Sequence, residues 1–159
     1  MLSPKFKINQ SSTDRVFITP EFFCNGHWLV VRKNLNKEGL KMFKPLADKI
    51  PGTYYANAFH DASTPDITQV IPKRDGYKPV NPGPTRVIFM EEGTSGTCID
   101  ISSYVYSVQD THEIGINPTY APLLTLGYAF NKDKTSPIIV LNSNDLNGDL
   151  IAVVMPRRI

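Results

Sequence analysis

Two Asn-Gly pairs, each placed between apolar runs, constrain the fold of this chain more than any other feature. Asn25-Gly26 lies inside RVFITPEFFCNGHWLVVRK, and Asn147-Gly148 lies inside SPIIVLNSNDLNGDLIAVVMP. Asn-Gly tolerates the positive φ angles of a type I′ turn, which joins two antiparallel strands. Both pairs therefore predict β-hairpins. Because Pro20 cannot donate to a sheet ladder, the first strand is expected to be an edge strand or to be interrupted there.

A short amphipathic helix is expected in NKEGLKMFKPLADK. Leu40, Phe43 and Leu46 recur every three residues, so they share one face of a helix. Gly39 and Pro45 weaken this helix, because glycine and proline are the poorest residues for a helix interior.

A second helix is expected after Asn117. Asn is a favoured N-cap, and Pro118 falls at the first helical position, where its missing N–H costs nothing. Pro122 removes one backbone hydrogen bond and should bend the helix slightly. The residues at helical spacing are Tyr120, Leu123, Leu124 and Tyr128.

Short strands and turns account for most of the remaining chain. Residues 52–59 and 66–72 are each expected to form a strand, and residues 73–85, rich in proline and glycine, to form a loop. Residues 85–102 predict a strand, a glycine-rich turn and a strand, and residues 104–108 alternate with the period of a strand. Hairpins dominate, so the prediction is an α+β fold with antiparallel pairing, in which the helices occupy matching places in two halves.

Length and charge favour a single domain with no obvious nucleic-acid signal. The chain has 159 residues, and we expect an N-terminal extension over residues 1–14 and one domain over residues 15–159. The net charge of +2 is too balanced to indicate nucleic-acid binding by itself. The sequence has no run long enough to span a membrane, and residues 1–12 lack the apolar core of a signal peptide, so we expect a cytoplasmic protein without membrane contacts.

The sequence carries no pattern that is typical of a catalytic or metal site. Cys24 and Cys98 form no CxxC pair and are expected to be buried thiols. His27, His60 and His112 have no metal-ligand spacing and are expected to be structural. The glycine-rich turn lacks the Lys-Ser/Thr of a phosphate loop. We therefore expect neither a metal, nor a cofactor, nor enzymatic activity.

Lysines on one side of the first helix are the clearest charged feature. The candidate phosphate contacts are Lys37, Lys41, Lys44 and Lys49. Each lysine close to a nucleic acid would displace a counterion, so binding would weaken as salt increases. The alternative is that these lysines form only a solvated helix face.

Five segments, in order along residues 24–159, resemble the C-terminal domain of the bacterial sliding clamp, the β subunit of the replicative polymerase. They are NGHWL, KEGLKMFKPL, TPDITQVIPK, HEIGINPTYAPLLTL and the closing LIAVVMPRRI. Trp28 stands where the clamp motif Asp-Gly-His-Arg-Leu has its arginine. The resemblance implies a DNA-clamp-like domain made of two similar halves, each with a short helix packed on antiparallel sheet.

The same resemblance implies a function and a binding site. The protein would be a non-enzymatic clamp relative, encoded by a phage or mobile element, that acts in DNA replication or repair through protein contacts and oligomeric DNA binding. Clamps hold short apolar peptides of their partner proteins in a surface pocket. Carried over, the pocket residues are Leu29, Val153, Val154, Met155, Pro156 and Arg158. Methionine suits adaptable apolar recognition, and arginine suits a peptide carboxylate. The alternative is that these residues pack with Trp28 as core.

Two other functions remain open from the sequence. One is a phage or virus structural or assembly protein that reuses a clamp-like sheet and self-associates without binding DNA. The other is an enzyme whose site forms around His27, His60 and Tyr54. The partners expected under the clamp interpretation are further copies of the chain, DNA, and replication proteins or their clamp-binding peptides.

Overall fold

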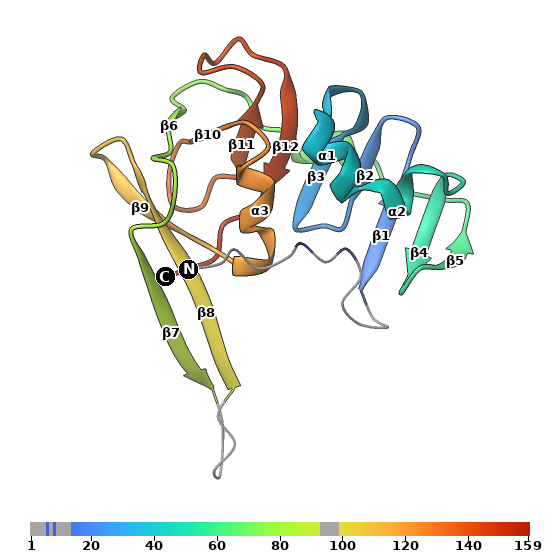
Figure 1. Ribbon diagram of the computed structural model, residues 1–159, viewed down its shortest axis with the longest axis horizontal. Coiled ribbons are helices and arrows are strands. Elements are labelled where there is room, and N and C mark those ends of the chain that lie inside the picture. Colours follow the sequence, from blue (N-terminus) through green and yellow to red (C-terminus); the bar gives the residue numbers. More distant parts are fainter. Residues whose placement is uncertain (1–5, 7, 9–13, 93–98) are drawn as a thin grey trace.

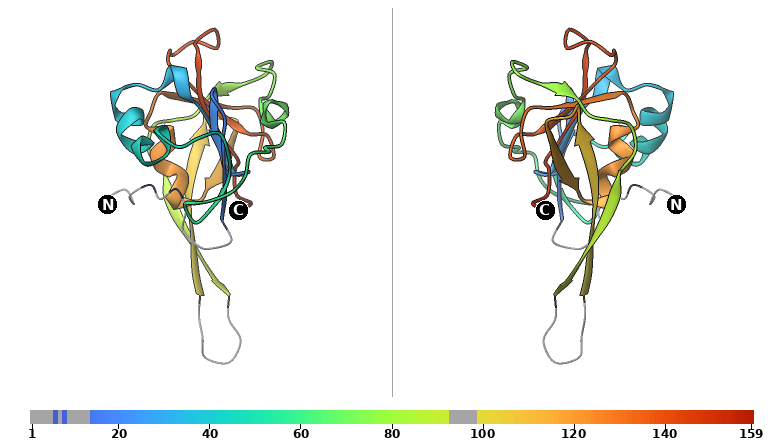
Figure 2. Two further views of the ribbon diagram at one scale, coloured as in Figure 1. Left: turned by 90° about the vertical axis from the view of Figure 1, so that its right-hand side faces the viewer. Right: turned by 90° about the vertical axis from the view of Figure 1, so that its left-hand side faces the viewer.

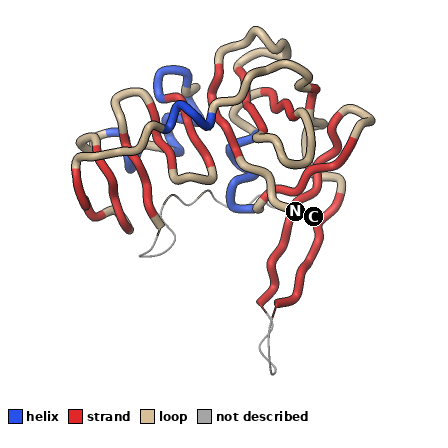
Figure 3. Tube along the Cα trace, turned by 180° about the vertical axis from the view of Figure 1, so that it is seen from behind, coloured by secondary structure: helices blue, strands red, loops and turns tan. Residues whose placement is uncertain are grey.

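The computed structural model describes residues 6, 8, 14–92 and 99–159. The described part has an α+β fold with antiparallel sheets and short helices (Figure 1). Nine strands form one sheet in the order β5-β4-β1-β2-β3-β12-β11-β10-β6, and three form a second sheet in the order β7-β8-β9. Strands make up much more of the trace than helices do when the molecule is seen from behind (Figure 3). Among the described residues, no helix combines the length and hydropathy of a membrane span.

The strands are β1 (Arg15–Ile18), β2 (Phe22–Cys24), β3 (Trp28–Val31), β4 (Gly52–Tyr55), β5 (Ala58–Asp61), β6 (Lys78–Pro79), β7 (Arg86–Glu92), β8 (Ile99–Val108), β9 (His112–Ile116), β10 (Tyr128–Asn131), β11 (Ile138–Leu141) and β12 (Leu150–Val154). The α-helices are α1 (Lys37–Met42), α2 (Lys44–Ala47) and α3 (Ala121–Leu124), and the 3₁₀ helices are η1 (Arg32–Asn34), η2 (Ile67–Val70) and η3 (Pro118–Tyr120).

The hairpin expected at Asn25-Gly26 is present as β2 and β3, with a different turn. The backbone N–H of Asn25 donates to the carbonyl of Trp28 at 3.1 Å, so the two central residues are Gly26 and His27. Of these only Gly26 has a positive φ, of +90°, whereas a type I′ turn needs positive φ at both. The first strand ends at Ile18, before Pro20, and is internal rather than an edge.

The first predicted helix is present as two short helices, α1 and α2. The prediction that Leu40 shares a buried face with Phe43 and Leu46 is therefore wrong. Phe43 and Leu46 are buried, but Leu40 is 58% exposed. Pro45 cannot donate a hydrogen bond, and its ring clashes with the carbonyl four residues earlier. The helix therefore ends at Met42 and starts again after Phe43, and this change of register leaves Leu40 in solvent.

The single strand expected over residues 52–59 is a hairpin. β4 and β5 are joined by Ala56 and Asn57, whose φ angles are +46° and +71°. Two consecutive positive φ angles are the signature of a type I′ turn, here without glycine. The sequence offers little indication of this turn, because alanine rarely adopts positive φ.

The strand expected over residues 66–72 is instead the 3₁₀ helix η2. The carboxylate of Asp66 accepts hydrogen bonds from the Thr68 backbone N–H at 3.1 Å and from its hydroxyl at 2.6 Å. These local bonds stabilise a capped turn in place of an extended ladder. Ile67 is still buried, so the apolar signal was correct and the inferred conformation was wrong.

The second half begins with the three-stranded sheet. Residues 104–108 belong to β8, as predicted, and the two flanking strands of the expected hairpin are β7 and β8. The turn predicted between them, at residues 93–98, lies outside the described residues. β7 and β8 project well beyond the main body (Figure 2). Residues 73–85, expected to be a loop, contain the two-residue strand β6.

The second helix starts as predicted and ends early. The side chain of Asn117 accepts a hydrogen bond from the Thr119 backbone N–H at 3.1 Å, and Pro118 opens the 3₁₀ helix η3. α3 follows and ends at Leu124, so Tyr128 lies in β10 instead of continuing the helical face.

The hairpin at the end of the sequence consists of β11 and β12, but Asn147-Gly148 is not at its centre. The connection runs from Asn142 to Asp149, whose backbone groups pair at 2.9 Å. β12 lies between β11 and β3, so it joins the strands of the two halves into one sheet. Arg157 forms a further bridge to Gly115 in β9.

The core lies on both faces of the nine-stranded sheet. Trp28, Val154 and Leu123 belong to one buried cluster, and Leu29 and Val153 belong to the other. Phe6, within the expected N-terminal extension, packs on the first cluster, because its ring centroid is 5.4 Å from those of Trp28 and Phe43. Cys24 is a buried thiol, as predicted, and Cys98 lies outside the described residues.

Candidate functional site

The pairing of β3 with β12 brings two distant segments of the sequence together. Leu29 is the cross-strand partner of Val153, and Trp28 is the partner of Val154. The next residue, Met155, donates its backbone N–H to the carbonyl of His27 at 2.8 Å. Two of the motif-like segments, NGHWL and VVMP, therefore lie side by side on adjacent strands.

The six predicted pocket residues are divided between core and surface. Leu29, Val153 and Val154 are buried, with the first two on one face of the sheet and Val154 on the other. Met155 is 38% exposed, Pro156 is half-buried and Arg158 is exposed. The surface that a partner can reach therefore starts at Met155, and the three buried residues support it from within the sheet.

The residue that pairs with the Met155 N–H, His27, belongs to an aromatic pair. The ring of His27, in the β2–β3 turn, stacks on that of Tyr120, with a centroid distance of 6.0 Å and an interplanar angle of 20°. We call the surface formed by His27, Tyr120, Met155, Arg157 and Arg158 the C-terminal ledge. The sequence analysis named His27 only for the alternative enzyme site and did not name Tyr120 as a site residue, although each lies in a segment, NGHWL or INPTY, that resembles part of the clamp.

Within the C-terminal ledge, Tyr120 interacts electrostatically with Arg157. Burial raises the pKa of the Tyr120 hydroxyl, a hydrogen bond from Asn25 lowers it, and the charges of Asp14 and Arg157 act in opposite directions. The Arg157 backbone N–H also donates to the Gly115 carbonyl at 2.7 Å. A side chain at Gly115 would collide with Ile159, so the glycine allows the last residues to lie against β9.

The predicted lysine face is partly open to solvent. Lys37, Lys41 and Lys44 are exposed, and none of them makes a hydrogen bond or ion pair with another described residue. Lys49 differs, because its ammonium group lies 5.2 Å from the centre of the Tyr54 ring and donates to the Asn57 carbonyl at 3.4 Å. Three of the four candidate lysines are thus available for an anionic partner.

The three residues of the alternative enzyme hypothesis are not brought together. Tyr54 and His60 lie on the paired strands β4 and β5, whereas His27 lies in the β2–β3 turn, beyond β1. Tyr54 donates its hydroxyl to the Ile50 carbonyl at 2.7 Å. Within residues 14–92 and 99–159, no three His, Cys, Asp or Glu side chains cluster as metal ligands would.

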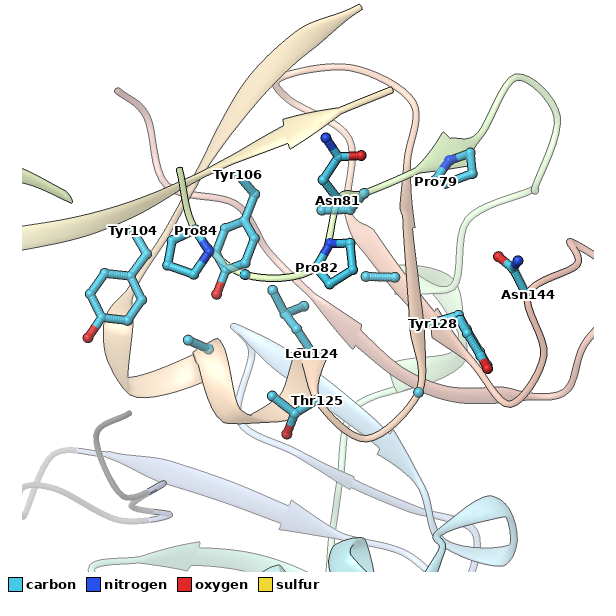
Figure 4. Close-up of a pocket in the computed structure, with 15 residues that line it drawn as sticks. Pro79, Asn81, Pro82, Pro84, Tyr104, Tyr106, Leu124, Thr125, Tyr128 and Asn144 are labelled. Atoms are coloured by element: carbon cyan, nitrogen blue, oxygen red, sulfur yellow. The ribbon is translucent and has the colours of Figure 1, made fainter. Parts of the chain in front are cut away.

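A concave site lies between the two sheets, and the sequence analysis did not predict it. Its volume is about 800 Å³, and it is shown in Figure 4. We call it the tyrosine pocket. It is lined by Pro79, Val80, Asn81, Pro82, Gly83, Pro84, Tyr104, Tyr106, Ala121, Leu124, Thr125, Gly127, Tyr128, Ala129 and Asn144. The sequence predicts only a loop for residues 79–84, and the clustering of three tyrosines depends on tertiary structure that no local pattern predicts.

The C-terminal ledge is therefore a surface built by two neighbouring strands, and the tyrosine pocket is a cavity built where the two sheets meet. No protein-family model, curated protein or solved structure matches this chain.

Proposed function

We propose that this chain is a non-enzymatic, sliding-clamp-like protein that acts in DNA replication or repair by holding short apolar peptides of other proteins on the C-terminal ledge. One observation carries the proposal. Residues 27–29 and 153–155, which resemble the two peptide-binding segments of clamps, are far apart in the sequence and lie on paired strands. A chance likeness of two short segments would give no reason for them to be neighbours.

The chemistry of the ledge suits an apolar peptide with an acidic group. Met155 offers a flexible, polarisable side chain, which adapts to different apolar partners. His27, whose carbonyl accepts the Met155 N–H, stacks its ring on that of Tyr120 and adds aromatic surface to the ledge. Arg158 is exposed and would form a charge-assisted hydrogen bond with a peptide carboxylate.

The clamp-like architecture in two similar halves is part of the proposal. Its support is the shared order of elements, because each half has a three-stranded meander, then helices, then further strands. A single domain of this size cannot surround DNA alone, so the proposal includes a homo-oligomer that presents Lys37, Lys41 and Lys44 of each copy to phosphates. The source would be a phage or mobile element.

Peptide titration tests the ledge. A fluorescently labelled clamp-binding peptide of a replicative polymerase is expected to bind the wild-type chain, and Met155→Ala is expected to weaken binding about tenfold. Val70→Ala is the matched control, because Val70 is a similarly exposed apolar residue, at 42%, in η2. No binding by the wild type, or equal effects of the two variants, would contradict the proposal.

Salt-dependent DNA binding tests the lysines. A triple variant with glutamine at positions 37, 41 and 44 is expected to reduce the slope of log affinity against log salt by roughly 0.9 for each phosphate that is no longer neutralised. The control carries glutamine in place of the exposed Lys73, Lys132 and Lys134, so both variants have the same net charge. Equal slopes for the two variants would remove the lysine face from the proposal.

One observation favours the assembly alternative. All four residues of the edge strand β5 are exposed, including Phe59. An exposed edge strand offers unpaired backbone groups to another chain. If sedimentation shows self-association while the chain binds neither DNA nor clamp-binding peptides, a phage or virus assembly role replaces the clamp role.

A further inference from the structure

The tyrosine pocket has walls from both sheets and from α3. Tyr104 and Tyr106 are two residues apart on β8, so their side chains lie on the same face of the strand. Pro82 and Pro84 come from the segment that leads into β7, and their rings lie beside Tyr106 in Figure 4. Tyr128 closes the opposite side. The volume of about 800 Å³ lies within the range of natural ligand sites.

The pocket lining carries hydrogen-bonding groups but no charge. None of the described lining residues is acidic, basic or a histidine. Tyr106 as a whole residue is 6% exposed and lines the pocket, and its hydroxyl makes no hydrogen bond with another described residue. In Figure 4 that hydroxyl points toward α3, within the pocket. Among the described residues, the buried polar atoms without a partner are Trp28 Nε1 and Ser103 Oγ, so the Tyr106 hydroxyl is open to the pocket, where it can donate a hydrogen bond to an occupant.

We propose that the tyrosine pocket binds a proline-rich segment of a partner protein in the polyproline II conformation. Such a segment has no internal hydrogen bonds, and its proline carbonyls are acceptors that need donors. The Tyr106 hydroxyl and the Asn144 amide supply donors, and the tyrosine rings that line the pocket supply apolar faces for proline rings. Aromatic-lined grooves are a recurring way to recognise this conformation. The uncharged lining matches an uncharged partner segment and disfavours a phosphorylated one.

This site is independent of the C-terminal ledge, because the two share no residue. The segment bound here is defined by proline and backbone carbonyls. The peptide proposed for the ledge is defined by apolar side chains and an acidic group. Failure of one proposal therefore leaves the other intact.

Titration calorimetry with an acetylated and amidated decaproline tests the inference on the full chain. We expect saturable binding, and we expect a flexible Gly-Ser peptide of equal length not to bind. Tyr128→Ala is expected to weaken binding about tenfold, and it should not disturb folding because Tyr128 is 51% exposed. Tyr106→Phe, which removes only the hydroxyl, is expected to weaken binding roughly threefold to tenfold. Tyr55→Ala, on β4 and outside the pocket, is the matched control.

Two results would overturn the inference. One is an absence of decaproline binding to the wild type at millimolar peptide. The other is binding that Tyr128→Ala and Tyr55→Ala affect equally, in samples whose thermal unfolding matches the wild type. If decaproline fails while indole binds in a manner that depends on Tyr128, the pocket belongs to a small aromatic ligand instead.

Discussion

In the first half of the molecule, residues 15–75, the strand that follows the helices returns to lie beside β1, so all five strands join one sheet. In the second half, residues 85–159, the strands that follow α3 do not return to their own meander. They extend the main sheet through β12, which pairs with β3 of the first half, and β7–β9 form a sheet of their own. The two halves thus share the order of their elements and differ in strand pairing.

The difference shows how a change of pairing creates a cavity. Pro79, Pro82 and Pro84 have no N–H group, so the segment that leads into β7 pairs with the main sheet over the two residues of β6 and then through one bond from Val80. Val80 lies where the sheets meet, because its N–H donates to Ala129 and it bridges to Val108. The space left between the sheets is the tyrosine pocket.

The largest expected effect tests whether the halves unfold together. Phe43, between the helices of the first half, stacks on Phe23 at 5.4 Å and belongs to the same core cluster as Leu123 of α3. Phe43→Ala should lower the free energy of unfolding by about 3–5 kcal/mol, because it leaves a cavity. We expect a single urea transition by Trp28 fluorescence and by circular dichroism. Transitions at different urea concentrations would mean that the halves are separate folding units.

The next-largest effect tests how tightly Tyr106, on β8 of the three-stranded sheet, is packed against the rest of the molecule. Burial, and then the nearby Tyr104, raises the pKa of Tyr106 to about 12. An unfolded tyrosine, with a pKa near ~10, loses its proton first, so stability is complete below pH ~10 and falls as pH rises toward ~12. The loss attributable to Tyr106 should approach about 2–3 kcal/mol. Urea unfolding of the wild type and Tyr106→Phe from pH 9 to pH 11.5 measures it, and a constant difference between them would show that the hydroxyl is well solvated.

A smaller effect distinguishes two N-caps, Asn36 of α1 and Asn117 of η3. The Asn36 side chain accepts from the Gly39 N–H at 3.0 Å and also donates to the Leu126 carbonyl of the second half at 2.8 Å. Asn117 caps η3 in the same way, through the Thr119 N–H, within its own half. Aspartate keeps the cap oxygen and loses the amide donor. Asn36→Asp should therefore cost about 1 kcal/mol, and Asn117→Asp less than about 0.5 kcal/mol, by thermal or urea unfolding. Equal costs would contradict this assignment.

The smallest effect concerns Leu40 of α1, the first of the two helices that replace the single predicted helix. Leu40→Ala should change the free energy of unfolding by less than about 0.5 kcal/mol, because the side chain is 58% exposed. Urea unfolding measures this change, with Val70→Ala, at another exposed apolar position, as the control. A loss above about 1.5 kcal/mol would mean that Leu40 is buried in solution, as one continuous helix would require.

Local chemistry predicted part of this fold from the sequence. Asn25-Gly26 predicted a hairpin, Asn117 and Pro118 predicted the start of a helix, and the number and spacing of the cysteines predicted that Cys24 is a buried thiol. The turn at Ala56-Asn57 was missed, because its positive φ angles are imposed by the pairing of β4 with β5 and not by residue preference.

The candidate sites depend on contacts between distant residues, which local patterns do not predict. The neighbourhood of residues 27–29 and 153–155 was suggested only by a family resemblance, and the burial of Leu29 and Val153 required the sheet itself. The tyrosine pocket could not be predicted from the sequence, because it forms only where the two sheets separate. In the sequence, its proline-rich wall looks the same as an ordinary surface loop.

The central position of β12 has a consequence for how the protein is made. Val30 pairs with Ala152, so the edge of β3 stays open while more than a hundred further residues leave the ribosome. Until β12 has been synthesised, the edge of β3 has no partner strand, and its backbone groups can pair with strands of other nascent chains. We expect synthesis in cells to require either rapid translation or a chaperone that shields this edge until its partner arrives.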